Sequence, residues 1–252
     1  MNMPVSKRSQ TAGIAIILIV VVGLSGYFIA TYLFSPEPDT ITIHLCDTAC
    51  VIIEYKDTRI FIDPWYFLEN YTGLLADVVL ITHPHFDHYN ETTVNSIQKD
   101  ETMNILPASM DDEVLAHDGV GVVPGDIIQL GNITITAFYM YTYDFGHDRS
   151  FNWTSYLIDI NGFTIFHGGD AANMSEYTQL NGLVDVACLP IYFFDNTTIY
   201  SLEMIQPRYF IPYHFYVEYK NVWFDTWGSQ IPLVSDCEVI RMDYWTSYTF
   251  EF

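Results

Sequence analysis

Basic side chains are scarce in this chain of 252 residues, which has 9 Lys and Arg against 31 Asp and Glu and a formal net charge of −22. So acidic a protein repels polyanions, and we therefore expect no nucleic-acid partner. The carboxylates form no long acidic run, and no internal repeat or low-complexity tract divides the sequence. With 50% hydrophobic and 16% aromatic residues, the chain has enough apolar surface for a sizeable folded core.

Cysteine is equally scarce, since the sequence contains only 4. Cys46 and Cys50 would lie about 13 Å apart on one extended strand, too far for a disulfide unless a turn separates them. Cys188 lies in the apolar stretch VDVACLP. We therefore expect buried thiols with at most one bridge, and the sequence does not decide the pairing.

Charge is absent from residues 12–34 (AGIAIILIVVVGLSGYFIATYLF). About 23 helical residues span roughly 34 Å, enough to cross a bilayer, so this segment is predicted to be a transmembrane anchor. A cleaved signal peptide is the alternative, with a cut near Gly23 and Ser25. Lys7 and Arg8 precede the segment, which makes residues 1–11 a cytoplasmic tail. Residues 35–40 (SPEPDT) would be a short extended linker to a domain outside the cell membrane.

Asparagine sequons agree with an exterior, glycosylated surface. More are present than chance would give from the Asn, Ser and Thr content, although the sequence does not show whether the host cell glycosylates asparagine. The sequons begin at Asn70, Asn90, Asn132, Asn152, Asn173 and Asn196.

The remaining residues, 41–252, are predicted to form one α/β domain, because two groups of strand-like segments alternate with short helical ones. ITIHL, CVIIEY and RIFIDPW alternate as half-buried strands, and LLADVVLIT is an apolar run typical of a strand buried on both faces. SYLIDI and FTIFHGG flank Asn161 and Gly162, a strong hairpin signal. Helices are expected at residues 91–100, in MSEYTQL and in TTIYSLEMIQ, and strands in VDVACLP and RYFIPYHF.

The stretch ITHPHFDHYN contains His83, His85, Asp87 and His88 directly after the apolar run. Imidazole nitrogens and carboxylate oxygens that converge at about 2.0–2.2 Å bind zinc and related ions. His83 and His85 alternate onto one side of the chain and can share an ion, while Asp87 and His88 can serve a second ion nearby. A solvated polar loop is the alternative, but this pattern is rare by chance and favours a metal site.

The motif and several other stretches resemble the metallo-β-lactamase fold superfamily, in the family's order and over nearly all of residues 41–252. The similarity is greatest to the branch of ascorbate-phosphate-lactonase-like and uncharacterised metal-dependent hydrolases, with the phosphodiesterase acting on N-acyl phosphatidylethanolamine a more distant relative. The resemblance implies a four-layer αββα sandwich with two metals at the edge of its sheets. The other similar stretches are CVIIEYKDTRIFIDPW, PGDIIQLGNITITA, FTIFHGGD, VDVACLPI and IQPRYFIPYHF.

By this resemblance, His83, His85 and a later histidine would bind one ion, and Asp87, His88 and His214 the other. Asp170 of HGGD matches the bridging position. His147 is the better candidate for the remaining ligand, since it follows a strand as the family pattern requires, and His117 is expected to be an exposed loop residue. The alternatives are a turn-capping role for Asp170 and a buried core position for His214.

Two further residues would support the ligands. Asp63 of IDPW matches an aspartate that orients a ligand imidazole. His167 would lie near the metals or be a strand histidine without a catalytic role. Thr48 stands where many relatives have histidine, and Ala171 and the Phe215-Tyr216 pair also depart from the family pattern. These departures leave the metal ligands intact but make the substrate of relatives a poor guide.

The expected activity is hydrolysis of a small ester, lactone or phosphodiester by a metal-bound hydroxide that Asp87 helps to orient. Two divalent ions are expected, Zn first and Mn or Fe as alternatives. A lipid headgroup or a cell-envelope metabolite is a candidate substrate, because the short linker would hold the site beside the membrane. A surface protein that binds metal or a ligand without turnover is the competing hypothesis. The entrance could be lined by the aromatic residues Tyr139, Tyr141, Tyr143, Phe193 and Phe194.

Overall fold

Two β-sheets pack face to face in a computed structural model that describes residues 38–66, 73–142, 146–171, 173–192 and 195–252. From Thr40 to Phe252 the chain forms one compact unit. The anchor predicted at residues 12–34 lies outside the described residues. Within the described ranges, no helix has both the length and the apolar character needed to span a membrane.

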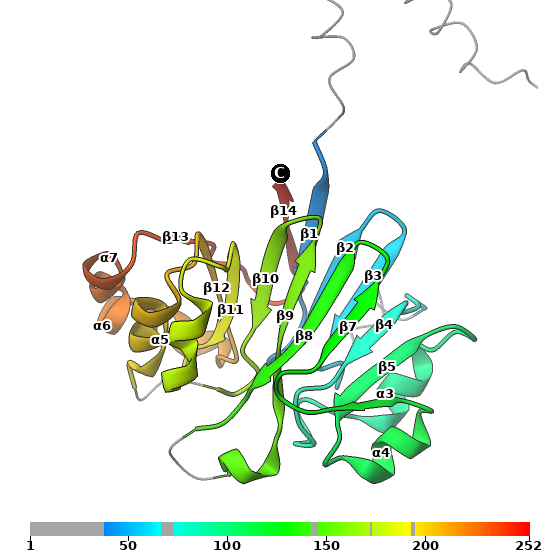
Figure 1. Cartoon of the computed structure of the whole chain (residues 1–252). Coiled ribbons are helices and arrows are strands. Elements are labelled where there is room, and N and C mark those ends of the chain that lie inside the picture. Colours follow the sequence, from blue (N-terminus) through cyan, green and yellow to red (C-terminus); the bar gives the residue numbers. More distant parts are fainter. Residues whose placement is uncertain (1–37, 67–72, 143–145, 172, 193–194) are drawn as a thin grey trace, which may run out of the picture. The chain divides into compact units, whose positions relative to one another are not determined.

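The first sheet begins with antiparallel strands and ends with parallel ones (Figure 1). β14, β1, β2 and β3 are paired antiparallel, and β3, β4, β5 and β6 are paired parallel. In spatial order the strands are β14 (Thr246–Glu251), β1 (Thr40–Leu45), β2 (Val51–Tyr55), β3 (Thr58–Ile62), β4 (Val78–Leu80), β5 (Met103–Pro107) and β6 (Val120–Val122).

The second sheet has the same division in the same order along the chain. β7, β8, β9 and β10 are antiparallel, and β10, β11, β12 and β13 are parallel. Its strands are β13 (Glu238–Val239), β12 (Tyr209–Tyr213), β11 (Val186–Pro190), β10 (Phe163–His167), β9 (Thr154–Ile160), β8 (Ile133–Tyr139) and β7 (Ile127–Leu130).

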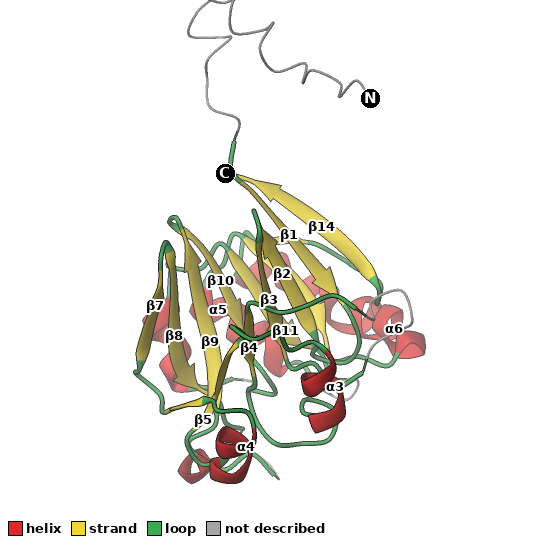
Figure 2. Ribbon diagram, turned by 90° about the vertical axis from the view of Figure 1, so that its right-hand side faces the viewer, coloured by secondary structure: helices red, strands yellow, loops and turns green. Residues whose placement is uncertain are grey.

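Helices cover the outer faces of both sheets, as Figures 1 and 2 show. The arrangement is the αββα sandwich predicted from the sequence. α3 (Glu91–Ser96) and α4 (Asp111–Ala116) lie beside the first sheet, where Val94 and Ile97 pack against Phe61 and Val79. The second sheet is covered by α5 (Thr197–Ile205), α6 (Val217–Trp227), α7 (Ile231–Val234) and the 3₁₀ helix η3 (Ser175–Leu180).

Several predicted elements differ in length from those observed. β4 has only three residues, so Ile81 and Thr82 already belong to the loop that carries the histidine motif. The helix expected at residues 91–100 ends after Ser96, and MSEYTQL forms a 3₁₀ helix. The hairpin at Asn161 and Gly162 is confirmed, with φ angles of 54° and 88° that suit the mirror-image turn.

A turn separates Cys46 from Cys50, which is the alternative that the sequence left open for this pair. The Cys46 N–H donates to the Cys50 carbonyl at 2.8 Å, and the Cys50 N–H donates to the Asp47 carbonyl at 2.8 Å. Both thiols are buried on the outer side of the first sheet. Burial, together with the neighbouring Cys46, raises the pKa of the Cys50 thiol well above its ordinary value. All four cysteines are free thiols.

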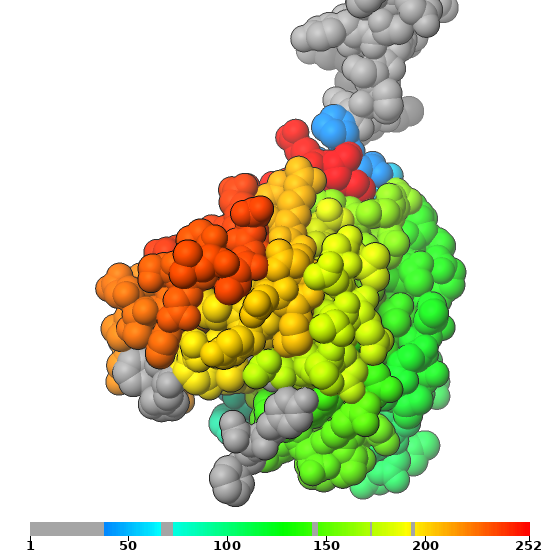
Figure 3. Space-filling model, turned by 60° about the vertical axis from the view of Figure 1, so that its left-hand side comes forward, coloured from blue at the N-terminus to red at the C-terminus, as the bar shows by residue number. Residues whose placement is uncertain are grey.

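The two sheets bring the carboxyl ends of β3, β4, β10, β11 and β12 to one edge of the sandwich (Figure 1). Ligands bind preferentially at such edges, because the loops that leave parallel strands meet there. Both ends of the described chain lie at the other edge, where Thr40 pairs with Glu251. Figure 3 shows the start of β1 in blue beside the C-terminal strand in red.

Candidate metal centre

Six of the seven metal ligands predicted from the sequence follow strands whose carboxyl ends meet at one edge of the sandwich. His83, His85, Asp87 and His88 follow β4, Asp170 follows β10, and His214 follows β12. His147 reaches the same place from the loop after β8. The structure brings all seven together in two groups that could each hold an ion.

The first group consists of His83, His85, His147 and Asp170. His83 Nε2 lies 3.0 Å from His85 Nδ1 and 3.4 Å from His147 Nε2. Asp170 Oδ2 lies 3.1 Å from His147 Nε2 and 3.7 Å from His83 Nε2. The Trp153 ring packs against this group, with its centroid 5.1 Å from that of His83. Three imidazoles and a carboxylate oxygen are a ligand set that suits zinc.

The second group consists of Asp87, His88 and His214. His214 Nε2 lies 3.6 Å from Asp87 Oδ2. The other oxygen of Asp170, Oδ1, lies 2.9 Å from His88 Nε2 and 3.2 Å from His214 Nε2. Asp170 therefore faces one group with each of its carboxylate oxygens, which is the geometry of a bridging ligand.

Three of the ligand atoms lack hydrogen-bond partners in the described part of the chain and could instead bind a cation. His88 Nε2, Asp170 Oδ1 and His214 Nε2 are buried and have no hydrogen-bond partner among the described residues. Orphaned buried polar atoms are costly and rare in folded proteins. Lone pairs from imidazole and carboxylate groups converge on the same small space, and an ion that accepts them would satisfy all three atoms.

Asp63 fixes the orientation of two ligand histidines. Its Oδ2 accepts hydrogen bonds from His88 Nδ1 and from the Thr82 hydroxyl, both at 2.7 Å, and its Oδ1 accepts from the Thr82 N–H at 2.7 Å. Because the Thr82 hydroxyl donates to Asp63, it can only accept from His83 Nδ1, which lies 2.9 Å away. Both rings are thereby protonated on Nδ1, and their Nε2 lone pairs face the cluster.

Thr82 was missed in the sequence, where a threonine at the end of an apolar strand resembles any other strand residue. The only signal was its position directly before His83. Its side chain is fully buried and carries the effect of Asp63 to a second ligand.

The charges of the cluster oppose the effect of burial. Burial alone would raise the pKa of the Asp170 carboxyl, but His88 and His214 hold it well below its ordinary value. Burial would lower the pKa of His88, but Asp170 and Asp63 raise it well above its ordinary value. His83 behaves differently, since burial and the neighbouring His88 lower its pKa. These charges keep Asp170 an anion, which suits a ligand of a cation.

Three backbone positions at the edge adopt left-handed conformations. Asp63 has φ 50° and His214 has φ 58°, which are unusual for residues with a side chain. Gly169, with φ 57°, precedes Asp170, and a Cβ there would lie 3.1 Å from Met140 and from Thr82. The loops that contain Asp63, Gly169 and His214 are thus held in strained conformations, which direct the ligand side chains towards the metal cluster.

Both ends of the His147 loop are tied to one carboxylate. Tyr141 donates to Glu176 Oε2 at 2.5 Å, and Arg149 donates to Glu176 Oε1 at 2.8 Å. Within the loop, the Thr142 N–H donates to the His147 carbonyl at 3.0 Å. The alternative, His117, lies elsewhere. It is buried and bonds through Nε2 to the Tyr89 hydroxyl, so the expectation of an exposed loop residue is wrong.

His167 supports loops instead of joining either ligand group. Its Nε2 donates to the Ala49 carbonyl at 2.8 Å, and its Nδ1 accepts from the Gly169 N–H at 3.2 Å. Its ring stacks on Tyr213, with centroids 4.8 Å apart. Burial lowers its pKa, which suits a neutral ring in this role. It therefore links the Ala49 turn to the backbone that precedes Asp170.

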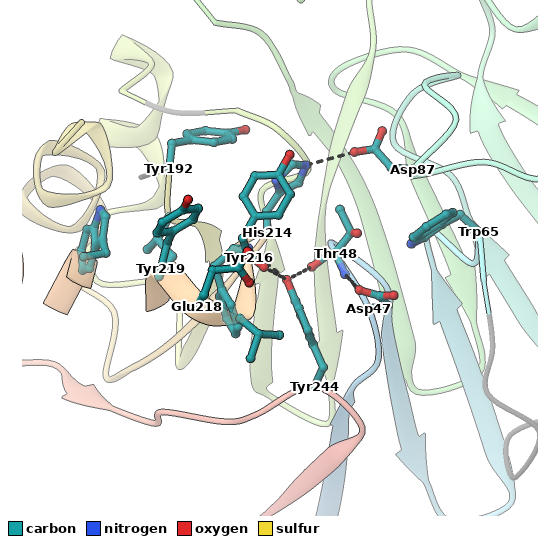
Figure 4. A pocket seen from close by; sticks show the side chains of 14 residues that line it. Asp47, Thr48, Trp65, Asp87, Tyr192, His214, Tyr216, Glu218, Tyr219 and Tyr244 are labelled. Atoms are coloured by element: carbon teal, nitrogen blue, oxygen red, sulfur yellow. Dashed lines mark hydrogen bonds and ion pairs between the residues drawn. The ribbon is translucent and has the colours of Figure 1, made fainter. Parts of the chain in front are cut away.

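A cavity of about 530 Å³ opens beside the second ligand group, and Asp87 and His214 belong to both. Figure 4 shows Tyr192, Tyr216 and Tyr219 on one side and Trp65 on the other, with the dashed contact between His214 and Asp87 at the rear. Its lining residues are Asp47, Thr48, Trp65, Asp87, Ile191, Tyr192, His214, Phe215, Tyr216, Val217, Glu218, Tyr219, Trp223 and Tyr244.

Of the aromatic residues predicted to line the entrance, Tyr139 and Tyr141 do not line this cavity. Tyr139 packs under the Arg149 guanidinium, and Tyr141 is buried against Glu176. Tyr143, Phe193 and Phe194 lie outside the described residues. Thr48, which stands in place of a common histidine, acts through its backbone: its carbonyl accepts from the His214 N–H at 2.9 Å.

Comparison with known proteins gives a consistent result. Residues 42–214 match the family described as the β-lactamase superfamily domain. A UPF0173 protein of Pyrococcus furiosus is 30% identical over 178 residues, which is 68% of this chain and 81% of that protein. A UPF0173 metal-dependent hydrolase of Symbiobacterium thermophilum is 31% identical over 175 residues, covering 63% of this chain and 69% of the relative.

The fold also has counterparts among solved structures. Igni18, a metallo hydrolase from the archaeon Ignicoccus hospitalis, superposes with a TM-score of 0.67 at 20% identity, covering 84% of this chain and 99% of that chain. At this level of identity the likeness concerns the fold alone.

Proposed function

Because the chain belongs to the β-lactamase superfamily and is one of its metal-dependent hydrolases, we propose that it uses two divalent ions to cleave a small ester, lactone or phosphodiester. One observation carries the two-ion proposal. The two carboxylate oxygens of Asp170 lie 2.9 Å from His88 Nε2 and 3.1 Å from His147 Nε2, so they face different ligand groups. Because enzyme activity follows from the family, the competing hypothesis of a protein without turnover is set aside.

Each ion would have its own side chains and share one. His83, His85 and His147 would hold the first ion, and Asp87, His88 and His214 the second, with Asp170 bound to both. The imidazole-rich set favours Zn, and Mn or Fe are the alternatives that accept the same mixture of nitrogen and oxygen ligands.

When bound, two such cations supply a nucleophile at neutral pH by lowering the pKa of a water, and they stabilise the negative charge that develops during hydrolysis. The chain's own residues would orient the reaction. Asp87 lies at the cavity wall, where its carboxylate can accept a hydrogen bond from the attacking water. Burial would raise the pKa of Asp87, but the neighbouring imidazoles of His214 and His88 lower it, which keeps it an acceptor.

The cavity supports a small substrate. Its volume of about 530 Å³ is that of a typical small-molecule site. A net charge of −22 and the low number of basic residues argue against a polynucleotide. The remaining candidate substrates are a small ester, a lactone or a phosphodiester. The single negative charge of a phosphodiester would be neutralised by the ions.

The activity can be tested with purified protein loaded with Zn, Mn or Fe. We expect about two ions per chain by elemental analysis and turnover of bis(p-nitrophenyl) phosphate, p-nitrophenyl acetate or a simple lactone. His85→Ala should abolish turnover, and His44→Gln is the matched control, because His44 lies on β1 and pairs with Glu54. Protein that carries both ions but turns over none of these substrates would contradict the proposal.

We also propose that residues 12–34 anchor the domain to the outer side of the cell membrane. The uncharged stretch and the preceding Lys7 and Arg8 support this topology. In intact cells a membrane-impermeant amine reagent should label Lys56, which is exposed in the β2–β3 turn. Lys220 is buried and is the internal control. Labelling of Lys56 only after lysis would show that the domain faces the cytoplasm, which would contradict the proposed topology.

A further inference from the structure

We propose that the cavity beside Asp87 and His214 binds an ammonium group, quaternary or primary, on the part of the substrate that lies away from the cleaved bond. This inference rests on the proposed hydrolase function and specifies its substrate class. It is carried by the charges and rings that line the cavity.

No basic side chain is available in the cavity to receive an anion. Among the described residues, none of those that line it is Lys or Arg. The undescribed internal segments, residues 67–72, 143–145, 172 and 193–194, contain neither residue type in the sequence. A carboxylate or phosphate monoester at this end of a substrate would therefore be desolvated without a counter-charge, which is costly.

The basic residues of the described domain pair with carboxylates or lie over aromatic rings. Arg59 pairs with Glu54, Lys99 with Asp77 and Arg149 with Glu176. Lys220, the basic residue nearest to the cavity in sequence, pairs with Asp243 and lies over the Phe215 ring. Lys56, Arg208 and Arg241 lie over the rings of Tyr55, Tyr209 and Phe224.

Aromatic rings form much of the cavity wall and come from four parts of the chain. Tyr192 follows β11, Tyr216 and Tyr219 lie at the start of α6, Tyr244 precedes β14, and Trp65 follows β3. Tyr216 and Tyr219 meet edge to face with centroids 6.1 Å apart, and the Tyr216 side chain is 73% exposed. The faces of such rings attract a cation, and ammonium groups are recognised by surrounding them with several rings.

Two carboxylates complete the lining. Asp47, in the turn between Cys46 and Cys50, is half-buried, and Glu218 is exposed near the rim on α6. They lie on different elements and add negative charge to a wall whose other described side chains are neutral or are metal ligands. The net charge of −22 would also draw a cation towards the domain.

A neutral apolar group of the same shape is the alternative occupant, because the rings would also bury a hydrocarbon. The decisive comparison is p-nitrophenyl phosphocholine against p-nitrophenyl 3,3-dimethylbutyl phosphate, which replaces the quaternary nitrogen by carbon. In both, the oxygen of a water forms a new bond to phosphorus, its proton passes to the solvent, and the bond from phosphorus to the p-nitrophenyl oxygen breaks to release p-nitrophenolate. We expect kcat/KM to be at least about tenfold higher for the choline ester, mainly through a lower KM.

Binding can be measured without turnover by titrating the metal-loaded protein with choline and with 3,3-dimethylbutanol in a calorimeter. Choline should bind more tightly. Tyr216→Leu and Glu218→Gln should each bring the affinity ratio of the two ligands towards one, and Glu203→Gln, a matched exposed substitution on α5, should leave it unchanged.

The outcomes separate the inference from the proposed function. Equal or better binding of the neutral ligand, with bis(p-nitrophenyl) phosphate still cleaved, would overturn the ammonium site and leave the hydrolase intact. Tight choline binding that survives both substitutions would also overturn it. Loss of all hydrolysis with choline preference preserved would instead reject the proposed function.

Discussion

The carboxylate of Asp63 accepts a hydrogen bond from His88 Nδ1 at 2.7 Å, and both side chains are fully buried. This contact leaves His88 only its Nε2 atom to offer to an ion. A buried aspartate that touches neither the ion nor the cavity therefore sets the geometry of the second ligand group.

Asp63→Asn should weaken the site while keeping the side-chain shape. The amide cannot accept all three hydrogen bonds that the carboxylate accepts from Thr82 and His88. The imidazole rings of His83 and His88 therefore lose the contacts that aim their Nε2 atoms at the cluster. We expect metal affinity or kcat/KM to fall about 10- to 100-fold. Competition with a chromogenic chelator measures the affinity.

Asp185 provides a control for this substitution. Its Oδ2 accepts from the N–H and hydroxyl of Thr164, at 2.9 Å and 3.1 Å, in the same way that Asp63 accepts from Thr82. Asp185→Asn should therefore perturb the backbone similarly without changing metal affinity. Equal effects of the two substitutions would show that Asp63 acts only on folding.

Asp170→Asn should affect both ions, whereas Asp87→Asn should affect one. Each oxygen of Asp170 serves a different group, while Asp87 lies only in the second. We expect the metal content of the Asp170 variant to fall below one ion per chain and that of the Asp87 variant to stay near one. Turnover should fall on the order of 100-fold or more in both. Identical metal contents in the two variants would argue against a bridge.

Removal of the ions should destabilise the fold as well as the activity. Ions that bind only the folded chain stabilise it, by about 2.7 kcal/mol when the free ion is at 100 times its Kd. For a domain of this size, Tm should fall by about 5–11 °C for each ion that chelation removes. Calorimetric scans before and after chelation and after addition of Zn test this. A Tm that does not respond would mean that these side chains do not hold an ion.

Glu176→Gln should loosen the His147 loop in a pH-dependent way. Burial would raise the pKa of Glu176, but Tyr141, Ser175 and the Arg149 guanidinium lower it below its ordinary value of 4.5. A carboxyl whose pKa is lower in the folded state stabilises the fold above that ordinary value, and the contribution disappears as pH falls through the folded pKa.

The wild type should therefore have a higher Tm than this variant at pH 7, and the difference should shrink below pH 4.5 and vanish as pH falls through the folded pKa of Glu176. At neutral pH the variant should also bind metal more weakly, since both ends of the loop lose a contact. Glu203→Gln serves as the surface control. A Tm difference that is constant with pH would exclude the carboxylate charge as the cause.

Four of the ligand residues could be proposed from the sequence because their spacing is local, whereas His147, Asp170 and His214 followed from the family resemblance. His83, His85, Asp87 and His88 lie within one loop, and the apolar strand before them fixes where that loop begins. The contacts of Thr82 and His117 could not be proposed from the sequence. Thr82 forms a hydrogen bond with Asp63, 19 residues away, and His117 forms one with Tyr89, 28 residues away. Pairings across such distances leave no periodic signal in the chain.

The cavity wall was missed for a different reason. α6 buries Lys220, Trp223 and Phe224, so its core-facing stripe includes a lysine and is only one turn long. Such a helix has little hydrophobic periodicity. Its aromatic residues at the cavity, Tyr216 and Tyr219, are exposed, and nothing in the sequence distinguishes them from ordinary surface tyrosines.

The pairing of β1 with β14 has a practical consequence. Thr40 lies opposite Glu251, while Leu45, at the other end of β1, leads into the turn that carries Asp47 and Thr48 to the cavity. A tag or sensor surface joined to the C-terminal residue would therefore be attached a full strand length from the mouth of the cavity. Enzyme captured in this orientation leaves the mouth open to dissolved ligands, which makes surface-based binding assays of small molecules feasible.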